Sequence, residues 1–117
     1  MSKAGGEGVS QFKGLVVEES LDSPLLVNRM RVTKVDVSLN PTWHTYTVTL
    51  SRDEIHQLQK HLKPRWYAHF WKGNDVIAIF KDKSFEFDHA KKESWKDAVE
   101  FGVAQGIPRE QLDFPIS

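Results

Sequence analysis

The sequence predicts an α+β fold: a mainly antiparallel sheet of about five to six strands with two helices on one face. Apolar and polar residues alternate at 31–39 and 43–50, which is typical of half-buried strands. Short apolar segments separated by turns follow within 66–87. Two segments have apolar residues at helical spacing. Strands and helices in this order favour an antiparallel sheet.

The first strands are predicted from short-range patterns. Residues 15–17 form a β-branched run that can be a strand, and Pro24 interrupts the segment after it. In 31–39, alternation places three apolar residues on one side: Val35, Val37 and Leu39. A turn at Asn40–Thr42 leads into 43–50, whose threonines face outward. These two strands are expected to form a hairpin with one solvated face.

Both helices carry boundary signals. Ser51 and Glu54 have the spacing of a capping box, and Pro64 ends the predicted helix near Lys63 after about three turns. Gly106 is a predicted left-handed cap after the second helix. The second helix is expected to carry five residues on one face: Trp95, Ala98, Val99, Gly102 and Val103.

The remaining strands form a predicted meander over 66–71, 76–80 and 85–87, with a four-residue loop at 72–75. The C-terminal residues alternate like one more strand. Pro115 cannot donate a ladder hydrogen bond, so this strand is expected at an edge. Its apolar residues are Leu112, Phe114 and Ile116.

Length and composition limit the classes of protein. At 117 residues the chain fits a single domain, predicted over 13–117, with residues 1–12 as a disordered tail rich in Gly and Ser. The absence of cysteine excludes disulfides and thiolate chemistry. No apolar run approaches the ~20 residues of a membrane span, so a cytoplasmic protein without membrane contact is expected. Equal numbers of basic and acidic residues disfavour nucleic acid as a partner.

Two long motifs carry a resemblance to known proteins. The first is the segment 62–70, Leu-Lys-Pro-Arg-Trp-Tyr-Ala-His-Phe, continued by Phe-Lys-Asp-Lys at 80–83. The second is Gly-Ile-Pro at 106–108 with Glu-Gln-Leu-Asp-Phe-Pro-Ile at 110–116. From about Leu15 to Ile116 the chain resembles a family of small, functionally uncharacterised prokaryotic proteins. The resemblance implies a compact intracellular domain and supplies no activity, cofactor or site residue.

The segment 63–72 is the strongest candidate for a site, because both faces of its predicted strand are aromatic. One interpretation is a central strand that is covered on both faces. A second is an exposed interface, such as that of a homodimer or protein complex. A third is a stacking platform for a planar ligand, with basic residues for phosphate. The candidate binding residues are Arg65, Tyr67, His69, Trp71 and Lys72.

Signals for catalysis and metal binding are weak. No histidine pair has the spacing of a helical metal site, so no metal ligands and no cofactor are predicted. A long-range group is an alternative, although solitary surface histidines are the more ordinary explanation; it would join His44, His69 and His89 with Asp88 or Glu86. No nucleophile motif or phosphate loop occurs, so no catalytic residue is assigned.

The sequence therefore predicts a non-enzymatic binding or protein-interaction module that uses its aromatic sheet face. The alternative is a small enzyme, or a small-ligand or nucleotide-binding protein, with a pocket around His69. That alternative requires a concave cavity that contains His69 and a second titratable group.

Overall fold

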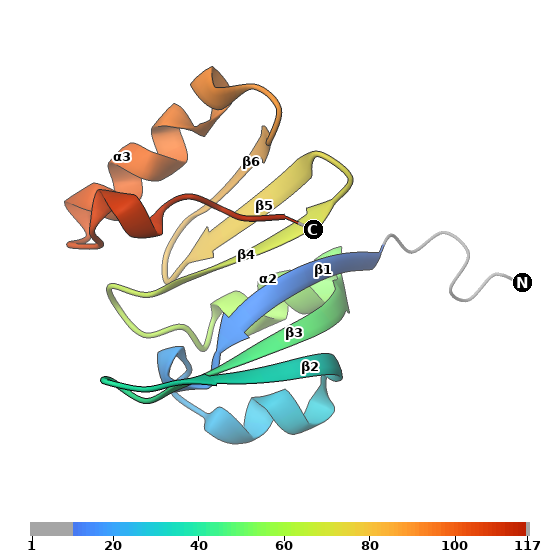
Figure 1. Cartoon of the computed structure of the whole chain (residues 1–117). Helices are drawn as coiled ribbons and strands as arrows, with labels where there is room; N and C mark the ends of the chain where they lie inside the picture. The colour runs from blue at the N-terminus through green and yellow to red at the C-terminus, as the bar shows by residue number, and fades with distance from the viewer. Residues whose placement is uncertain (1–10, 117) are drawn as a thin grey trace, which may run out of the picture.

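A computed structural model describes residues 11–116, apart from three side chains within 24–29. The fold is the predicted α+β class, with a six-stranded antiparallel sheet in the order β2-β3-β1-β4-β5-β6 (Figure 1). The strands are β1 (Gln11–Val17), β2 (Arg31–Ser38), β3 (Trp43–Ser51), β4 (Tyr67–Lys72), β5 (Asp75–Phe80) and β6 (Ser84–Asp88).

Strand β1 is the structural link between the two halves of the sheet. It pairs along its whole length with β3 and, through Lys13–Leu15, with β4. The domain begins earlier than predicted, because Gln11 and Phe12 belong to β1 and Phe12 is buried. The rest of the predicted tail, residues 1–10, lies outside the described residues.

The two helices, α2 (Arg52–Gln59) and α3 (Lys96–Ala104), lie on opposite faces of the sheet, not on one face as predicted. Strand β4 separates the two cores: Ala68 and Phe70 pack with α2, whereas Trp71 packs with α3. Each helix covers the face on which the preceding strand buries its apolar residues. These residues are Val48 and Leu50 before α2, and Phe87 before α3.

Local signals correctly placed the start of α2 and the cap after α3. In the capping box, Ser51 Oγ accepts from the Glu54 backbone N–H at 3.2 Å, and Glu54 Oε1 accepts from the Ser51 N–H at 2.8 Å. Helix α2 ends at Gln59, earlier than predicted, and turns continue to Leu62. Gly106 has φ +94° after α3, as predicted for a left-handed cap.

Four 3₁₀ segments complete the fold. Two lie between β1 and β2, one directly precedes α3 and one follows it. They are η1 (Glu18–Ser20), η2 (Pro24–Arg29), η3 (Lys92–Trp95) and η4 (Arg109–Gln111). The loop between β4 and β5 is shorter than predicted, because Lys72 already pairs with Asp75.

Strand β2 is exposed along its whole length, whereas the sequence predicted a half-buried strand. The predicted hairpin with β3 is present, but all eight β2 residues are exposed because β2 is the outermost strand. The C-terminal residues 112–116 also differ from the prediction. They form no strand and instead pack across the α3 face of the sheet, with Leu112 and Phe114 buried. Among the described residues, no helix is long and apolar enough to cross a membrane.

Candidate ligand-binding site

The C-terminal segment leaves a pocket of about 390 Å³ between itself and the strands β1, β3 and β4. The two motifs that carried the family resemblance meet here from opposite sides, with four lining residues from the first and five from the second. The lining comprises Leu15, Val17, Trp43, Thr45, Arg65, Trp66, Tyr67, His69, Ile107, Glu110, Gln111, Asp113 and Pro115.

One wall of the pocket is aromatic. Trp43 begins β3, and Trp66 immediately precedes β4. Their ring centroids are 5.3 Å apart in an edge-to-face arrangement, which is a favoured geometry for aromatic pairs. Both side chains are partly exposed, so their remaining surface is available to the pocket.

Tyr67 and His69 form the floor, since alternate residues of β4 face the same side. The Tyr67 hydroxyl donates to the Gln111 carbonyl. His69 Nε2 lies 2.7 Å from the Pro115 carbonyl oxygen. A carbonyl can only accept, so His69 carries its proton on Nε2. These two hydrogen bonds fasten the C-terminal segment to β4.

Burial keeps both floor residues uncharged. It lowers the pKa of His69, and the Pro115 carbonyl and the Asp113 charge only partly oppose this effect. Burial also raises the pKa of Tyr67, and the negative charge of Asp113 adds to this. At neutral pH the floor therefore presents a neutral imidazole and a protonated phenol.

Charged residues stand at the rim. Arg65, Glu110 and Asp113 are all exposed, and Arg65 forms no ion pair among the residues that the structure describes. The Arg65 side chain runs past Gly106, with its Cδ and Nε 3.8 Å from the position that a Cβ would take there.

Strained backbone borders the pocket. Within residues 11–116, only three residues other than glycine have positive φ, and two of them are Arg65 at +70° and Phe114 at +41°. Such conformations are unfavourable for residues with a Cβ and are common at binding sites. At Arg65 the conformation directs the chain into β4, and at Phe114 it turns a buried ring onto Tyr67 and His69.

Of the five predicted binding residues, Arg65, Tyr67 and His69 line the pocket. The other two, Trp71 and Lys72, do not. Trp71 is buried and stacks on His69 with centroids 5.3 Å apart, and its Nε1 has no hydrogen-bond partner within the described chain. Lys72 lies exposed at the end of β4. The aromatic strand is thus central and largely buried, as the first interpretation proposed.

Sequence reasoning missed the residues that other segments bring to the pocket. The sequence placed Thr45 on a solvated hairpin face and Asp113 in an edge strand, and it singled out neither Trp43 nor Glu110 as a site residue. A tryptophan on the threonine side of 43–50 was the available signal, because a solvated face rarely carries one.

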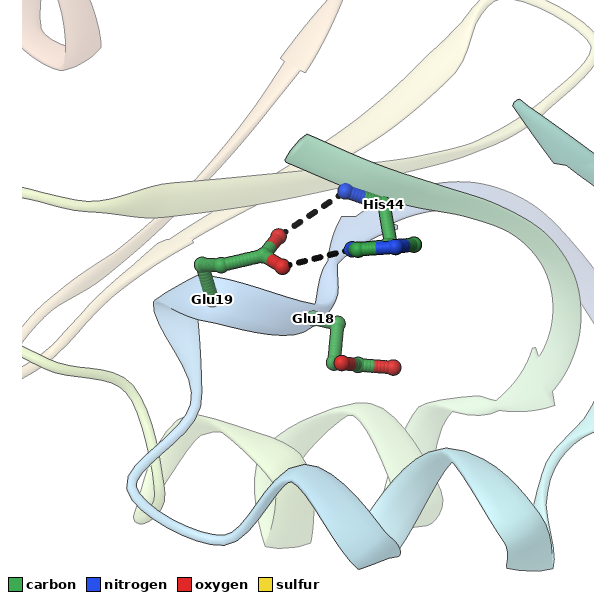
Figure 2. A group of neighbouring side chains, drawn as sticks. All are labelled: Glu18, Glu19 and His44. Atoms are coloured by element: carbon green, nitrogen blue, oxygen red, sulfur yellow. Dashed lines mark hydrogen bonds and ion pairs between the residues drawn. The ribbon is translucent and has the colours of Figure 1, made fainter. Parts of the chain in front are cut away.

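A second polar cluster lies on the α2 face, where Glu18 and Glu19 of η1 meet His44 of β3 (Figure 2). Glu19 points at His44, and its oxygens lie 2.9 Å from the backbone N and 2.7 Å from ring Nδ1. The Tyr46 hydroxyl donates to Glu18 at 2.7 Å. The ligand atoms of Glu18, Glu19 and His44 are close enough together to surround a cation, but both carboxylates already accept hydrogen bonds. We interpret this cluster as a structural contact that joins η1 to β3 through hydrogen bonds.

In this contact, His44 and Glu19 have pKa values that are shifted in opposite directions. The hydrogen bond to Glu19 raises the pKa of His44. Partial burial raises the pKa of Glu19, but the hydrogen bonds from His44 outweigh that effect and lower it. The predicted alternative that joins His44, His69 and His89 is not formed among the described residues, where Glu18, Glu19 and His44 are the only such group.

The pKa values of the two histidines, His44 and His69, are expected to be shifted in opposite directions. Followed by NMR of the ring protons, His44 should gain its proton above the ordinary pKa of 6.5 and His69 below it. The stability that His44 contributes is then full below pH 6.5 and lost as pH rises through its raised pKa. That of His69 is full above pH 6.5 and lost as pH falls through its lowered pKa. The reverse titration order would contradict the burial of His69.

Comparison with family models, with curated proteins and with solved structures finds no significant match to this chain. The family resemblance of the two motifs stays a prediction.

Proposed function

We propose that this domain is a non-enzymatic binding module whose pocket takes a small planar ligand with an anionic group. The observation that carries the proposal is the position of Arg65, which forms no ion pair with any residue in 11–116. It lies beside the Trp43–Trp66 wall in a pocket whose floor is uncharged. The volume of about 390 Å³ lies within the range of small-molecule sites.

The aromatic wall supports a planar ligand. A flat ring that stacks on an exposed tryptophan face gains roughly 1–3 kcal/mol, with little dependence on its identity. Trp43 and Trp66 are ordered by their mutual contact, so little side-chain entropy is lost when a ring stacks on them.

The charges at the rim narrow the ligand class further. The Arg65 guanidinium is suited to a carboxylate or phosphate, which it can bind through two parallel hydrogen bonds. Glu110 and Asp113 would repel a second anion but accept hydrogen bonds from an amino group. These residues together favour a planar ring that carries one anionic group and one hydrogen-bond donor, as in a nucleoside monophosphate.

A protein-interaction role for the same surface is the other form of this hypothesis. Most of the predicted aromatic face is covered by Phe114, so a protein partner could reach only the pocket mouth. A homodimer through Tyr67, His69 and Trp71 would require the C-terminal segment to detach. The small ligand needs no such rearrangement.

The enzyme alternative stays a prediction. The pocket contains His69 and other titratable groups, which is the cavity that this alternative requires. His69, however, is only 3% exposed, and its Nε2 proton is donated to Pro115. A group so enclosed is better placed to shape a pocket than to exchange protons with a reactant.

The test is a titration of tryptophan fluorescence with adenosine monophosphate and with adenosine, which lacks the phosphate. We expect the monophosphate to bind more tightly, and Arg65→Gln to weaken it about tenfold and remove that preference. Arg109→Gln, an exposed arginine outside this pocket, is the matched control and should change nothing.

Two results would contradict the proposal. One is equal weakening by Arg65→Gln and Arg109→Gln, which would reveal a non-specific charge effect. The other is the absence of saturable binding by these two probes and by indole acetate, a smaller planar carboxylate.

A further inference from the structure

Strand β2 exposes a complete sheet edge. It is the last strand in the sheet order, and β3 is its ladder partner. At the opposite edge, η3 binds the end of β6, where Trp95 Nε1 and Ser94 Oγ both donate to the Asp88 carbonyl. All eight residues of β2 are exposed, so this edge is open to another strand. Such edges readily pair with a further chain.

Exposed apolar side chains gather at this same edge. Among the described residues, four of the five large hydrophobic residues that are exposed lie in β2 or directly after it: Val32, Val35, Val37 and Leu39. Val35 and Val37 are 50% and 55% exposed. A group of exposed apolar residues on one strand is typical of a contact surface.

A β-bulge aligns these valines. The register with β3 shifts between Val32 and Lys34, so Thr33 is the extra residue. Val32 then lies opposite Val48, and Val35 opposite Tyr46, both of which face the α2 core. Without the bulge, Val32 and Val35 would face opposite sides of the sheet.

We propose that β2 is a dimerisation edge that pairs antiparallel with β2 of a second copy about a two-fold axis at Val35. The observation that selects a second copy as the partner is the charge pattern of the strand. Lys34 and Asp36 flank Val35 on one face, 3.6 Å apart and well exposed. In the proposed pairing, each Lys34 lies opposite Asp36 of the other copy, and Val35 lies opposite itself.

The charges also select the register. Antiparallel two-fold pairing centred on Lys34 would place two lysines opposite each other, and pairing centred on Asp36 would do the same for two aspartates. Like charges directly opposite each other are destabilising. Only the register centred on Val35 gives two opposite-charge pairs. A two-fold arrangement of this kind is closed, because each copy uses its own β2 edge in the contact.

The interface is small, so the dimer should be weak and should dissociate on dilution. A net charge of zero places no general repulsion between copies. Lys34 and Asp36 do not line the ligand pocket, so this proposal does not rest on the proposed function.

The first test measures molecular mass by sedimentation over a range of concentrations. The wild-type mass should rise from one chain to two. Lys34→Asp and Asp36→Lys each convert both ion pairs to repulsive pairs, so each should weaken the dimer about tenfold. The double swap Lys34→Asp/Asp36→Lys restores opposite charges and should restore dimerisation. A single-chain mass at all concentrations, or a double swap as weak as the single variants, would overturn the proposal.

The second test locates the axis. The chain has no cysteine, so one introduced thiol reports only its own contact with the second copy. Under mild oxidation, Val35→Cys should form a disulfide-linked dimer about tenfold faster than Val103→Cys, because residues directly opposite each other are within disulfide distance. Val103 is an exposed valine on α3 and is the matched control. Equal rates for the two variants would place any dimer contact elsewhere.

Discussion

Phe114→Ala is expected to destabilise the domain by about 3–5 kcal/mol, a large part of the stability of a small domain. Phe114 is fully buried although it lies in a segment without regular structure. Its ring lies 5.0 Å from Phe87 and 5.4 Å from Trp95, and it also contacts Tyr67 and His69 edge-on. Removing the ring leaves a cavity at the junction of β4, β6 and η3.

The same substitution should release the C-terminal segment, and urea unfolding together with hydrogen exchange would detect both effects. Exposure of His69 should return its pKa toward 6.5. Ile116→Ala, at a partly buried position in the same segment, should cost only about 1 kcal/mol. Phe114→Leu keeps most of the volume and serves if the alanine variant does not fold. A loss below 1 kcal/mol for Phe114→Ala would show that the segment is not anchored by this ring.

Local patterns predicted most of the elements, because their causes are local. The Ser51–Glu54 pair specifies a helix start through its own hydrogen bonds. Gly106 ends α3 because it adopts positive φ without steric cost. Alternation found β3 and β6 because each buries one apolar face.

Packing between distant segments was not predictable in the same way. The valines of β2 alternate as they would in a half-buried strand, and nothing within the strand states that it is outermost. The face that each helix covers depends on the connections around the sheet. Leu112 and Phe114 alternate like strand residues, yet they pack on the face of the sheet. Hydrogen bonds hold this segment there, from Tyr67 to the Gln111 carbonyl and from His69 to the Pro115 carbonyl.

The candidate site was predictable in its centre and not at its edges. Tyr67, His69 and Arg65 belong to one short aromatic segment, which marked them as unusual. Trp43 and Asp113 reach the pocket only through the pairing of β1 with β3 and the path of the C-terminal segment. Trp71 belongs to the same aromatic segment, but it lies farther along β4 and its side chain is buried, so it does not reach the pocket.

Gly14→Ala is expected to cost about 3 kcal/mol or more, the upper end for overpacking of a core. Gly14 lies in β1 directly opposite Phe70 of β4. A Cβ at this glycine would lie 2.0 Å from Phe70 Cδ2 and 2.4 Å from Cε2, far inside van der Waals contact. Phe70 is fully buried and cannot move aside without disturbing the α2 core. The glycine thus allows the central strands to carry a large ring.

Urea unfolding of four variants, which include Phe70→Leu alone, would isolate this cause. Gly73→Ala, at a turn glycine with φ +60° and no atom near its Cβ position, should cost only about 1 kcal/mol of backbone strain. Phe70→Leu in the Gly14→Ala background should cost less than the sum of the two single changes, because the smaller side chain makes room for the methyl group. Simple additivity of the two changes would show that the ring over Gly14 is not what requires a glycine there.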